Sequence, residues 1–258
     1  MKYITVTSSN VAKYTGHNKF DTLEKTVNEL LSKNGIKDVY IPRSNLEEIL
    51  LSLSEQDLTL LKQELDIPQT YSLGRVESHI KLNIMTGSYA GSLTEQQSKE
   101  LIDEKMAGKP ILQGISGGIK QDLRMRRGNI KENKNLDKIQ TKEKIQITQR
   151  NSTMYTKELY RCPTYVILLR GKVDGQTEDT VIESKNRTKK LFMELRDYER
   201  VQMECYMCLT GHKRALLTEH YNDTEHCIEC NHDEEFWQEC LDSIITFMDT
   251  HIAPCLSE

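Results

Sequence analysis

The segment that most constrains the fold is an apolar run followed by a turn and a second strand. Residues 163–170 are apolar and β-branched, which is typical of a buried strand, and residues 180–185 form the next strand. Asp174 stands beyond the end of the first strand, and Glu183 and Lys185 lie two apart on the second, so their side chains share a face. Two carboxylates and one ammonium on one side of a small sheet suit a hard divalent cation and an activated water. The same residues also describe an exposed hairpin with a surface ion pair.

Length and composition describe a soluble globular protein. The 258 residues, 37% hydrophobic and 29% charged, are enough to bury a sizeable core. There is no run of about 18 apolar residues and no apolar signal core at the start, so we expect neither a membrane span nor secretion. We therefore expect an intracellular protein, in the cytoplasm or nucleus of a host cell, whose seven cysteines are thiols or metal ligands rather than disulfides.

The charges are unevenly distributed along the chain. The net charge is −4, yet ten basic residues fall between Ile119 and Arg150, and eleven acids but no Lys or Arg follow Arg214. A basic middle permits a local phosphate-binding surface despite the negative total. A charged helix that is simply solvated would produce the same pattern.

Periodicity predicts a mixed α/β organisation. Helical spacing predicts a short helix after Ser9 and Asn10, and further helices at 22–33, 121–140, 188–209 and 233–252, with strands at 215–221 and 226–230. Residues 36–118 are predicted to form a mainly helical insertion or subdomain within one domain spanning 1–258. The glycine-rich segment Gly114–Lys120 lacks the spacer and the Gly-Lys-Ser/Thr ending of a phosphate loop, which excludes a P-loop NTPase.

Five short motifs in order resemble the PD-(D/E)XK nuclease superfamily, and within it the lambda-exonuclease or YqaJ-type viral recombinase family. The order of strand, Asp174, strand with Glu183-x-Lys185, helix and strand is that of the nuclease core. The other motifs that carry the resemblance are Thr7-x-Ser9-x-x-Ala12 with Gly16-x-Asn18, Gly128-x-x-x-Glu132, Gln202-x-x-x-Tyr206 of the RecB-like branch, and the acidic segment Asn231–Trp237 before the last helix.

The resemblance implies a role for each matching residue. Asp174 and Glu183 would be metal ligands, Lys185 the catalytic lysine, and Glu132 an additional acid at the metal. Gln202 would position the lysine, the water or the DNA backbone. The DNA contacts that it implies are Lys2, Ser9, Arg127, Asn129 and Tyr206. Lys2 stands where the lambda enzyme has an arginine, and a lysine lacks the bidentate fork.

The cysteines support a second interpretation. Cys205-x-x-Cys208 and Cys227-x-x-Cys230 are separated by residues 209–226, a spacing that fits a four-cysteine zinc site. Against zinc, the first pair lies in the predicted helix that carries Gln202, where cysteine is a common small core residue. Buried thiols therefore remain an alternative to structural zinc.

Together these observations lead to an expected fold and function. The expected fold is α/β (α+β), with a restriction-endonuclease-like core in which a small mixed central sheet is flanked by helices. The resemblance implies a Mg²⁺-dependent DNA exonuclease, for which Mn²⁺ can substitute, that digests duplex ends from 5′ to 3′ in viral or phage recombination, repair or replication. It also implies a single-strand annealing protein as partner and a ring trimer. The alternatives are an endonuclease of the same fold and a non-catalytic, zinc-stapled nucleic-acid-binding module.

Overall fold

The computed structural model describes residues 1–88 and 93–256. Its backbone divides into two compact units: the first combines Met1–Ile41 with Glu132–Glu258, and the second is Pro42–Lys131. Helix α8 (Ser116–Lys142) contributes residues to both units. No helix among the described residues is both long enough and apolar enough to cross a membrane.

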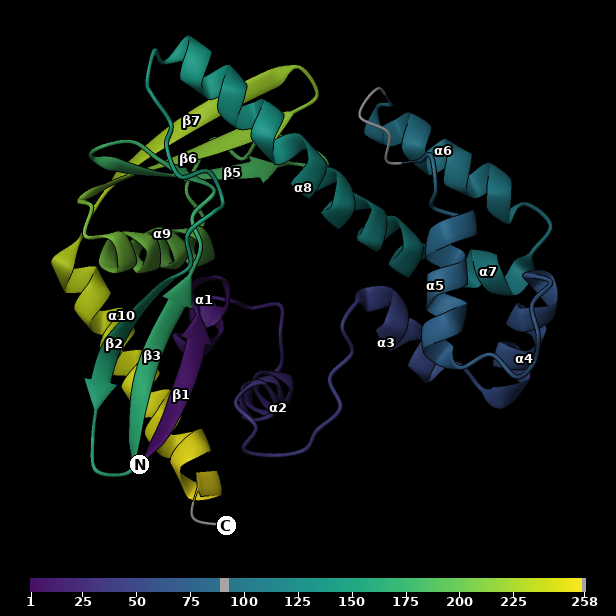
Figure 1. Cartoon of the computed structure of the whole chain (residues 1–258), viewed down its shortest axis with the longest axis horizontal. Helices are drawn as coiled ribbons and strands as arrows, with labels where there is room; N and C mark the ends of the chain where they lie inside the picture. The colour runs from purple at the N-terminus through teal and green to yellow at the C-terminus, as the bar shows by residue number, and fades with distance from the viewer. Residues whose placement is uncertain (89–92, 257–258) are drawn as a thin grey trace. The chain divides into compact units, whose positions relative to one another are not determined.

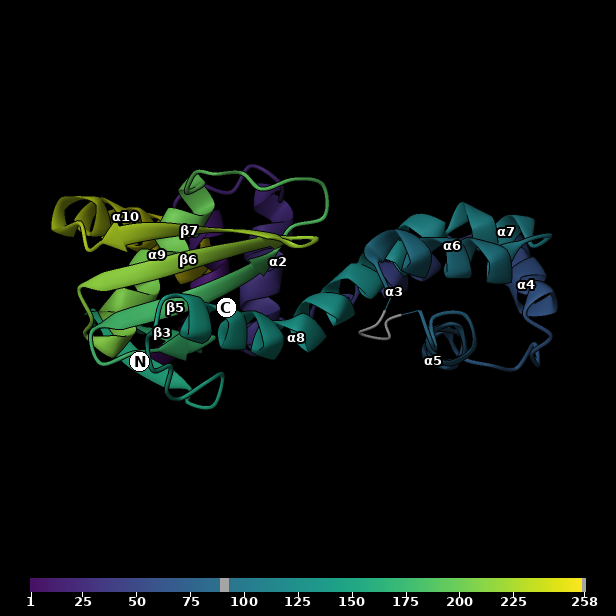
Figure 2. The same ribbon diagram turned by 90° about the horizontal axis from the view of Figure 1, so that it is seen from above.

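The first unit contains all the strands that the structure describes, in two small mixed sheets. The strands are β1 (Lys2–Thr7), β2 (Tyr155–Arg161), β3 (Tyr165–Gly171), β4 (Gly175–Gln176), β5 (Thr180–Asn186), β6 (Arg214–Tyr221) and β7 (Thr224–Asn231). One sheet has the order β1-β3-β2, with β1 parallel and β2 antiparallel to β3. The other has the order β4-β5-β6-β7, in which β5 and β6 are parallel and lie side by side with β7 (Figure 2).

The mixed α/β class is confirmed, although two sheets stand where one central sheet was predicted. The division lies between β3 and β5, where the chain passes through Asp174. Gly175 pairs with Ile182, but beyond this pair the Asp174 carboxylate, instead of a backbone carbonyl, accepts the N–H of Ser184 at 2.8 Å. At this point of the β5 edge, the Asp174 side chain therefore takes the place of a backbone carbonyl on a neighbouring strand.

The helices of the first unit cover these sheets. They are the 3₁₀ turn η1 (Ser8–Asn10), α1 (Val11–Tyr14), α2 (Leu23–Lys33), α9 (Asp197–Thr210), α10 (Glu234–Phe247), the π turn η2 (Met248–Ile252) and the 3₁₀ turn η3 (Ala253–Leu256). Helix α9 packs against strands of both sheets and ends at Gly211, whose φ of +80° favours glycine (Figure 1). Its buried side chains Val201 and Cys205 join the core formed by β1, β3 and α10.

The part of α8 that follows Lys131 also packs within the first unit. Leu136 and Ile139 bury their side chains in one cluster with Ile147, Ile182 and Leu216. Their spacing of three residues places them on one face of the helix. This cluster holds the helix against the strand that carries Glu183.

The second unit is helical. It contains α3 (Asn45–Ser52), α4 (Glu55–Glu64), α5 (Leu73–Asn83), α6 (Glu95–Met106), α7 (Pro110–Gly114) and the first part of α8. Thr94 and Gln97 form the capping box of α6, and their Thr-x-x-Gln spacing is by itself a signal for the start of a helix. Gly118 lies inside α8, and a Cβ at this position would stand 2.7 Å from the Ile49 side chain. The glycine thus permits close packing of α8 on α3.

One element was predicted with the wrong start, and one element was not predicted. The helix predicted for 188–209 begins only at Asp197, because Glu219 accepts the backbone N–H groups of Phe192 and Met193 and holds the preceding segment as a loop. Strand β2 was not predicted, since its residues are largely exposed and polar. Pairing with β3, rather than burial, makes it a strand.

Candidate active site

Asp174 is placed by backbone contacts on both sides. Its carboxylate accepts the Ser184 N–H, and its carbonyl accepts the N–H of Asn151 at 2.9 Å. The first contact fixes the carboxylate beside β5, one residue from Glu183. The structure therefore brings Asp174 to the two charged residues of β5, as the sequence predicts.

Glu183, Lys185, Gln202 and Tyr206 form a continuous chain of hydrogen bonds between β5 and α9. The Lys185 ammonium donates to Glu183 Oε1 at 2.5 Å and to Gln202 Oε1 at 3.2 Å. The Gln202 amide donates to the same Glu183 oxygen at 3.2 Å and to the Tyr206 hydroxyl at 2.7 Å. Gln202 and Tyr206 lie four apart on one helix face, so a single helix presents both to the strand.

Ionising both carboxylates at once is unfavourable in the metal-free protein. Burial and the neighbouring Glu183 raise the pKa of Asp174 to about 8, against the lowering effect of the Ser184 hydrogen bond. Glu183 is 5% exposed, and among the described residues its Oε2 has no hydrogen-bond partner. A buried anionic oxygen without a donor beside a second carboxylate is the environment that a divalent cation stabilises. The residues present therefore fit Mg²⁺.

Glu132 approaches this site from α8 through a bridging asparagine. Its Oε1 accepts the Asn151 side-chain N–H at 2.8 Å, and Asn151 in turn donates its backbone N–H to the Asp174 carbonyl. Asn151 has a left-handed φ of +42°, a conformation that asparagine tolerates better than most residues. Glu132 also acts electrostatically on Asp174 and helps to raise its pKa, after burial and Glu183.

Within the described part of the chain, no three His, Cys, Asp or Glu side chains gather closely enough to hold a metal ion. Asp174 and Glu183 thus form a pair of carboxylates, with Glu132 linked to them through Asn151. Backbone carbonyls and water commonly complete the coordination of Mg²⁺ in proteins.

A pocket of about 390 Å³ opens beside Tyr206. It is lined by Thr7, Ser8, Ser9, Met154, Arg170, Gly171, Lys172 and Tyr206. Ser8 donates its hydroxyl to the Arg170 carbonyl at 3.3 Å, and a Cβ on Gly171 would stand 2.1 Å from the Ser8 oxygen. Glycine at this position therefore permits the 3₁₀ turn to approach the end of β3. The lining combines two cations with hydroxyl groups, which are donors suited to a phosphate.

Ser9 and Tyr206, which are both predicted DNA contacts, line this pocket together, but the sequence did not indicate three of their neighbours. Ser8, Arg170 and Lys172 line the same pocket. The available signal was two basic residues spaced by two at the end of a predicted strand, next to the segment that carries Asp174. This signal could not be connected with the two serines, because the sequence does not show that η1 packs against β3.

Three predicted DNA contacts require correction or lie outside what can be described. Arg127 is 5% exposed and donates to Ser98 Oγ and to the Leu93 carbonyl, both at 2.6 Å, so it holds the helical unit together and is not available to DNA. Lys2 begins β1, roughly 16 Å along the strand from the end that adjoins the pocket. Asn129 lies in α8, and its side chain is outside the described part of the structure.

The four cysteines of the zinc interpretation are not brought together. Cys205 and Cys208 belong to the core beneath β1, β3 and α10, whereas Cys230 and Cys227 pack in two other apolar clusters. Burial raises the pKa of each of these thiols, and a raised pKa disfavours the thiolate that binds a metal. The structure thus describes these residues as free thiols, of which Cys205 is buried and the other three are partly buried.

Comparison with known proteins yields only remote similarity. No protein-family model and no curated protein matches the chain. Among solved structures, the alkaline exonuclease LHK-Exo from Laribacter hongkongensis is 13% identical with a TM-score of 0.41, over 67% of this chain and 88% of that one. Its complex with dAMP gives 12% and 0.40 over the same shares. The structure of SSO0001 gives 15% and 0.36, over 90% of this chain and 89% of that one. These values do not assign a family.

Proposed function

We propose that this protein is a Mg²⁺-dependent deoxyribonuclease of the PD-(D/E)XK type that degrades duplex DNA from its ends. The observation that carries the proposal is the hydrogen-bonded chain from Glu183 through Lys185 and Gln202 to Tyr206, with Asp174 beside it. An ammonium held between a carboxylate and an amide, next to a second carboxylate of raised pKa, supplies the groups that phosphodiester hydrolysis requires.

Each residue has a distinct task in this proposal. Asp174 and Glu183 would hold Mg²⁺, which supplies positive charge at the phosphate and favours the ionisation of water. Two of the three N–H donors of Lys185 are used by Glu183 and Gln202 within the described structure, which leaves the third for a substrate oxygen. Glu183 and Asp174 outweigh the effect of burial and raise the pKa of Lys185, so it carries its proton at neutral pH. Gln202 restricts the direction in which the ammonium points.

The activity itself is tested with linear duplex DNA labelled at either the 5′ or the 3′ end. The proposal predicts digestion that requires Mg²⁺ or Mn²⁺ and stops on chelation, and a 5′ label released as mononucleotide before the 3′ label. Nicking of closed circular DNA would instead indicate an endonuclease with the same chemistry. No hydrolysis of any DNA in either metal, by protein shown to be folded, would refute the proposal.

The pocket beside Tyr206 is proposed to receive the 5′-terminal phosphate of the DNA strand. Ser9 offers a hydroxyl group, and Arg170 and Lys172 offer positive charge. We predict that the double substitution R170A/K172A reduces the preference for 5′-phosphorylated over 5′-hydroxyl ends by about 10²-fold, since each of the two lost charged hydrogen bonds contributes roughly 1.5 kcal/mol or more. Competition between the two kinds of duplex in one reaction measures this preference. The exposed pair K33A/K37A is the matched control, and an unchanged preference in R170A/K172A would rule out the phosphate role.

A further inference from the structure

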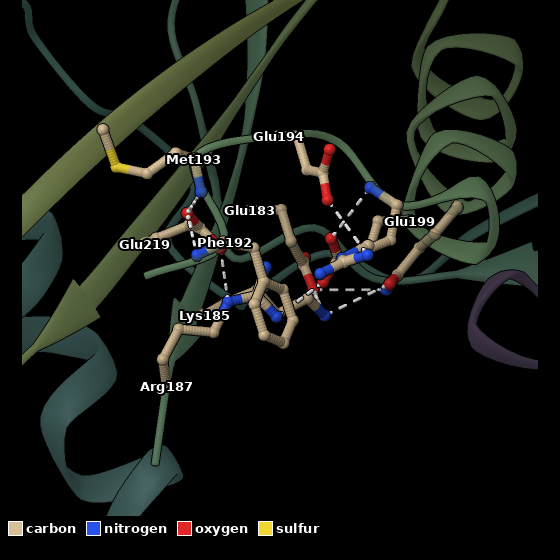
Figure 3. A network of polar contacts seen from close by, with 10 residues as sticks. Glu183, Lys185, Arg187, Phe192, Met193, Glu194, Glu199 and Glu219 are labelled. Carbon is tan, nitrogen blue, oxygen red and sulfur yellow. Dashed lines mark hydrogen bonds and ion pairs between the residues drawn. The ribbon is translucent and has the colours of Figure 1, made fainter. Parts of the chain in front are cut away.

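Arg187 follows β5 directly and is buried between two carboxylates. Its side chain is 9% exposed, and it donates from Nη1 to Glu199 Oε1 at 2.7 Å and from Nε to Glu219 Oε1 at 2.5 Å. Both carboxylates are almost fully buried, at 1% and 0% exposure. The guanidinium also lies over the Phe192 ring, 4.2 Å from its centroid. Figure 3 shows this network around the end of β5.

The two carboxylates belong to the elements that flank Lys185. Glu219 is the register partner of Lys185 on β6, and it also accepts the backbone N–H of Met193 at 2.9 Å. Glu199 lies in the first turn of α9, three residues before Gln202 and therefore on the same face of the helix. Arg187 thus joins β5, β6 and α9 at the point where they surround Lys185.

The charges of this network compete for the same ammonium. Glu219 and Glu199 lie on the strand and the helix that flank Lys185, and both of their carboxylates are bonded to Arg187. Without the guanidinium, Glu199 and Glu219 would be two buried anions without a compensating charge, and Lys185 would be a neighbouring cation able to pair with them.

We propose that Arg187 is a positioning residue that keeps the Lys185 ammonium on Glu183 and Gln202 by occupying Glu199 and Glu219. The direction of the Lys185 side chain follows from the hydrogen bonds of the folded protein. Its consequence for the rate of reaction rests on the nuclease function proposed above.

The first test is structural and does not depend on activity. Crystal structures of the R187M and R187K variants are compared with the wild type. In R187M we expect the Lys185 Nζ to leave Glu183 and to bond Glu199 or Glu219. In the triple variant R187M/E199Q/E219Q, which removes the competing charges and the instability of uncompensated anions, Lys185 is expected on Glu183 again. R187K keeps a cation beside the two carboxylates and is expected to leave Lys185 on Glu183 and Gln202. Lys185 remaining on Glu183 and Gln202 in R187M, or in the double variant R187M/E199Q where R187M does not fold, would overturn the proposal.

The second test measures single-turnover cleavage of linear duplex with saturating Mg²⁺. R187M is expected to lower kcat by about 10²-fold, because a displaced catalytic group has an effect of this order, with little change in KM. The triple variant should recover most of this loss, which a merely structural role for Arg187 would not produce. R214M, which removes an exposed arginine ion-paired with Asp179, is the matched control and should cleave like the wild type. A wild-type kcat in R187M would refute the proposal while leaving the nuclease function intact, whereas an inactive wild type would refute the function and leave the structural test valid.

Discussion

Replacing Lys185 by alanine is expected to reduce the rate of duplex hydrolysis by about 10²–10³-fold while the protein remains folded. Among the described residues, the ammonium is the one group that bonds both Glu183 and Gln202, and removing a preorganised donor of this kind costs a factor of about 10²–10³ in kcat. Glu183→Gln should have an effect of similar size, since it removes a metal-binding charge without changing the shape of the side chain. Single-turnover kinetics with an end-labelled duplex measures both.

The control for these variants is Lys33→Ala, which removes a lysine that is 51% exposed and pairs with Glu29 on α2. Its rate should match the wild type, because exposed ion pairs contribute little. Circular dichroism and thermal unfolding establish that each variant is folded. Wild-type hydrolysis by folded Lys185→Ala would show that the activity resides elsewhere.

Replacing Asp174 by asparagine is expected to stabilise the metal-free protein at pH 8 while abolishing hydrolysis. Burial and Glu183 raise the pKa of Asp174 to about 8, against an ordinary value of 3.8. Between these values the folded protein retains a proton that the unfolded chain has released, so the free energy of unfolding falls as the pH rises from about 4 to 8. Asp174→Asn removes this slope, and the gain in unfolding free energy at pH 8 is expected to be a few kcal/mol. Denaturant unfolding at several pH values, in chelator, measures it.

Asp179 supplies an opposite control in the same hairpin. Hydrogen bonds from Thr180 and Thr177, together with Arg214, lower its pKa, so Asp179→Asn should remove stability rather than add it. Mg²⁺ should restore stability to the wild type at pH 8 and should have little effect on Asp174→Asn, because a ligand stabilises only the folded state that binds it. If Asp174→Asn were less stable than the wild type at pH 8 without metal, the argument that burial and Glu183 disfavour the ionised form of Asp174 would be wrong.

Short-range periodicity was enough to predict which side chains of one element act together. Glu183 and Lys185 share a face because strands repeat every two residues, and Gln202 and Tyr206 share one because helices repeat every 3.6. Helix ends with strong local signals, such as the capping box at Thr94, were also predictable. These relations depend on neighbours in sequence, so no knowledge of the packing is needed.

Predictions failed where a distant partner overrode the local pattern. The apolar spacing in 188–196 indicates a helix, yet Glu219 binds the backbone at Phe192 and Met193 and keeps this segment a loop. Arg127 belongs to a basic run that suggests DNA contact, but its side chain is buried and donates hydrogen bonds to Ser98 and Leu93. In each case a buried polar group takes the partner that satisfies it, and this partner is remote in sequence.

The sequence alone thus determined the chemical groups of the site and their pairing within β5 and within α9. Only the tertiary structure decided how these pairs meet. It placed the Asp174 carboxylate on the backbone of β5, set Gln202 against Lys185, and buried Arg187 between Glu199 and Glu219. The physical reason is that a strand or helix repeat fixes the direction of neighbouring side chains, whereas contacts between elements depend on which buried charges and hydrogen-bonding groups must be compensated when the whole chain packs.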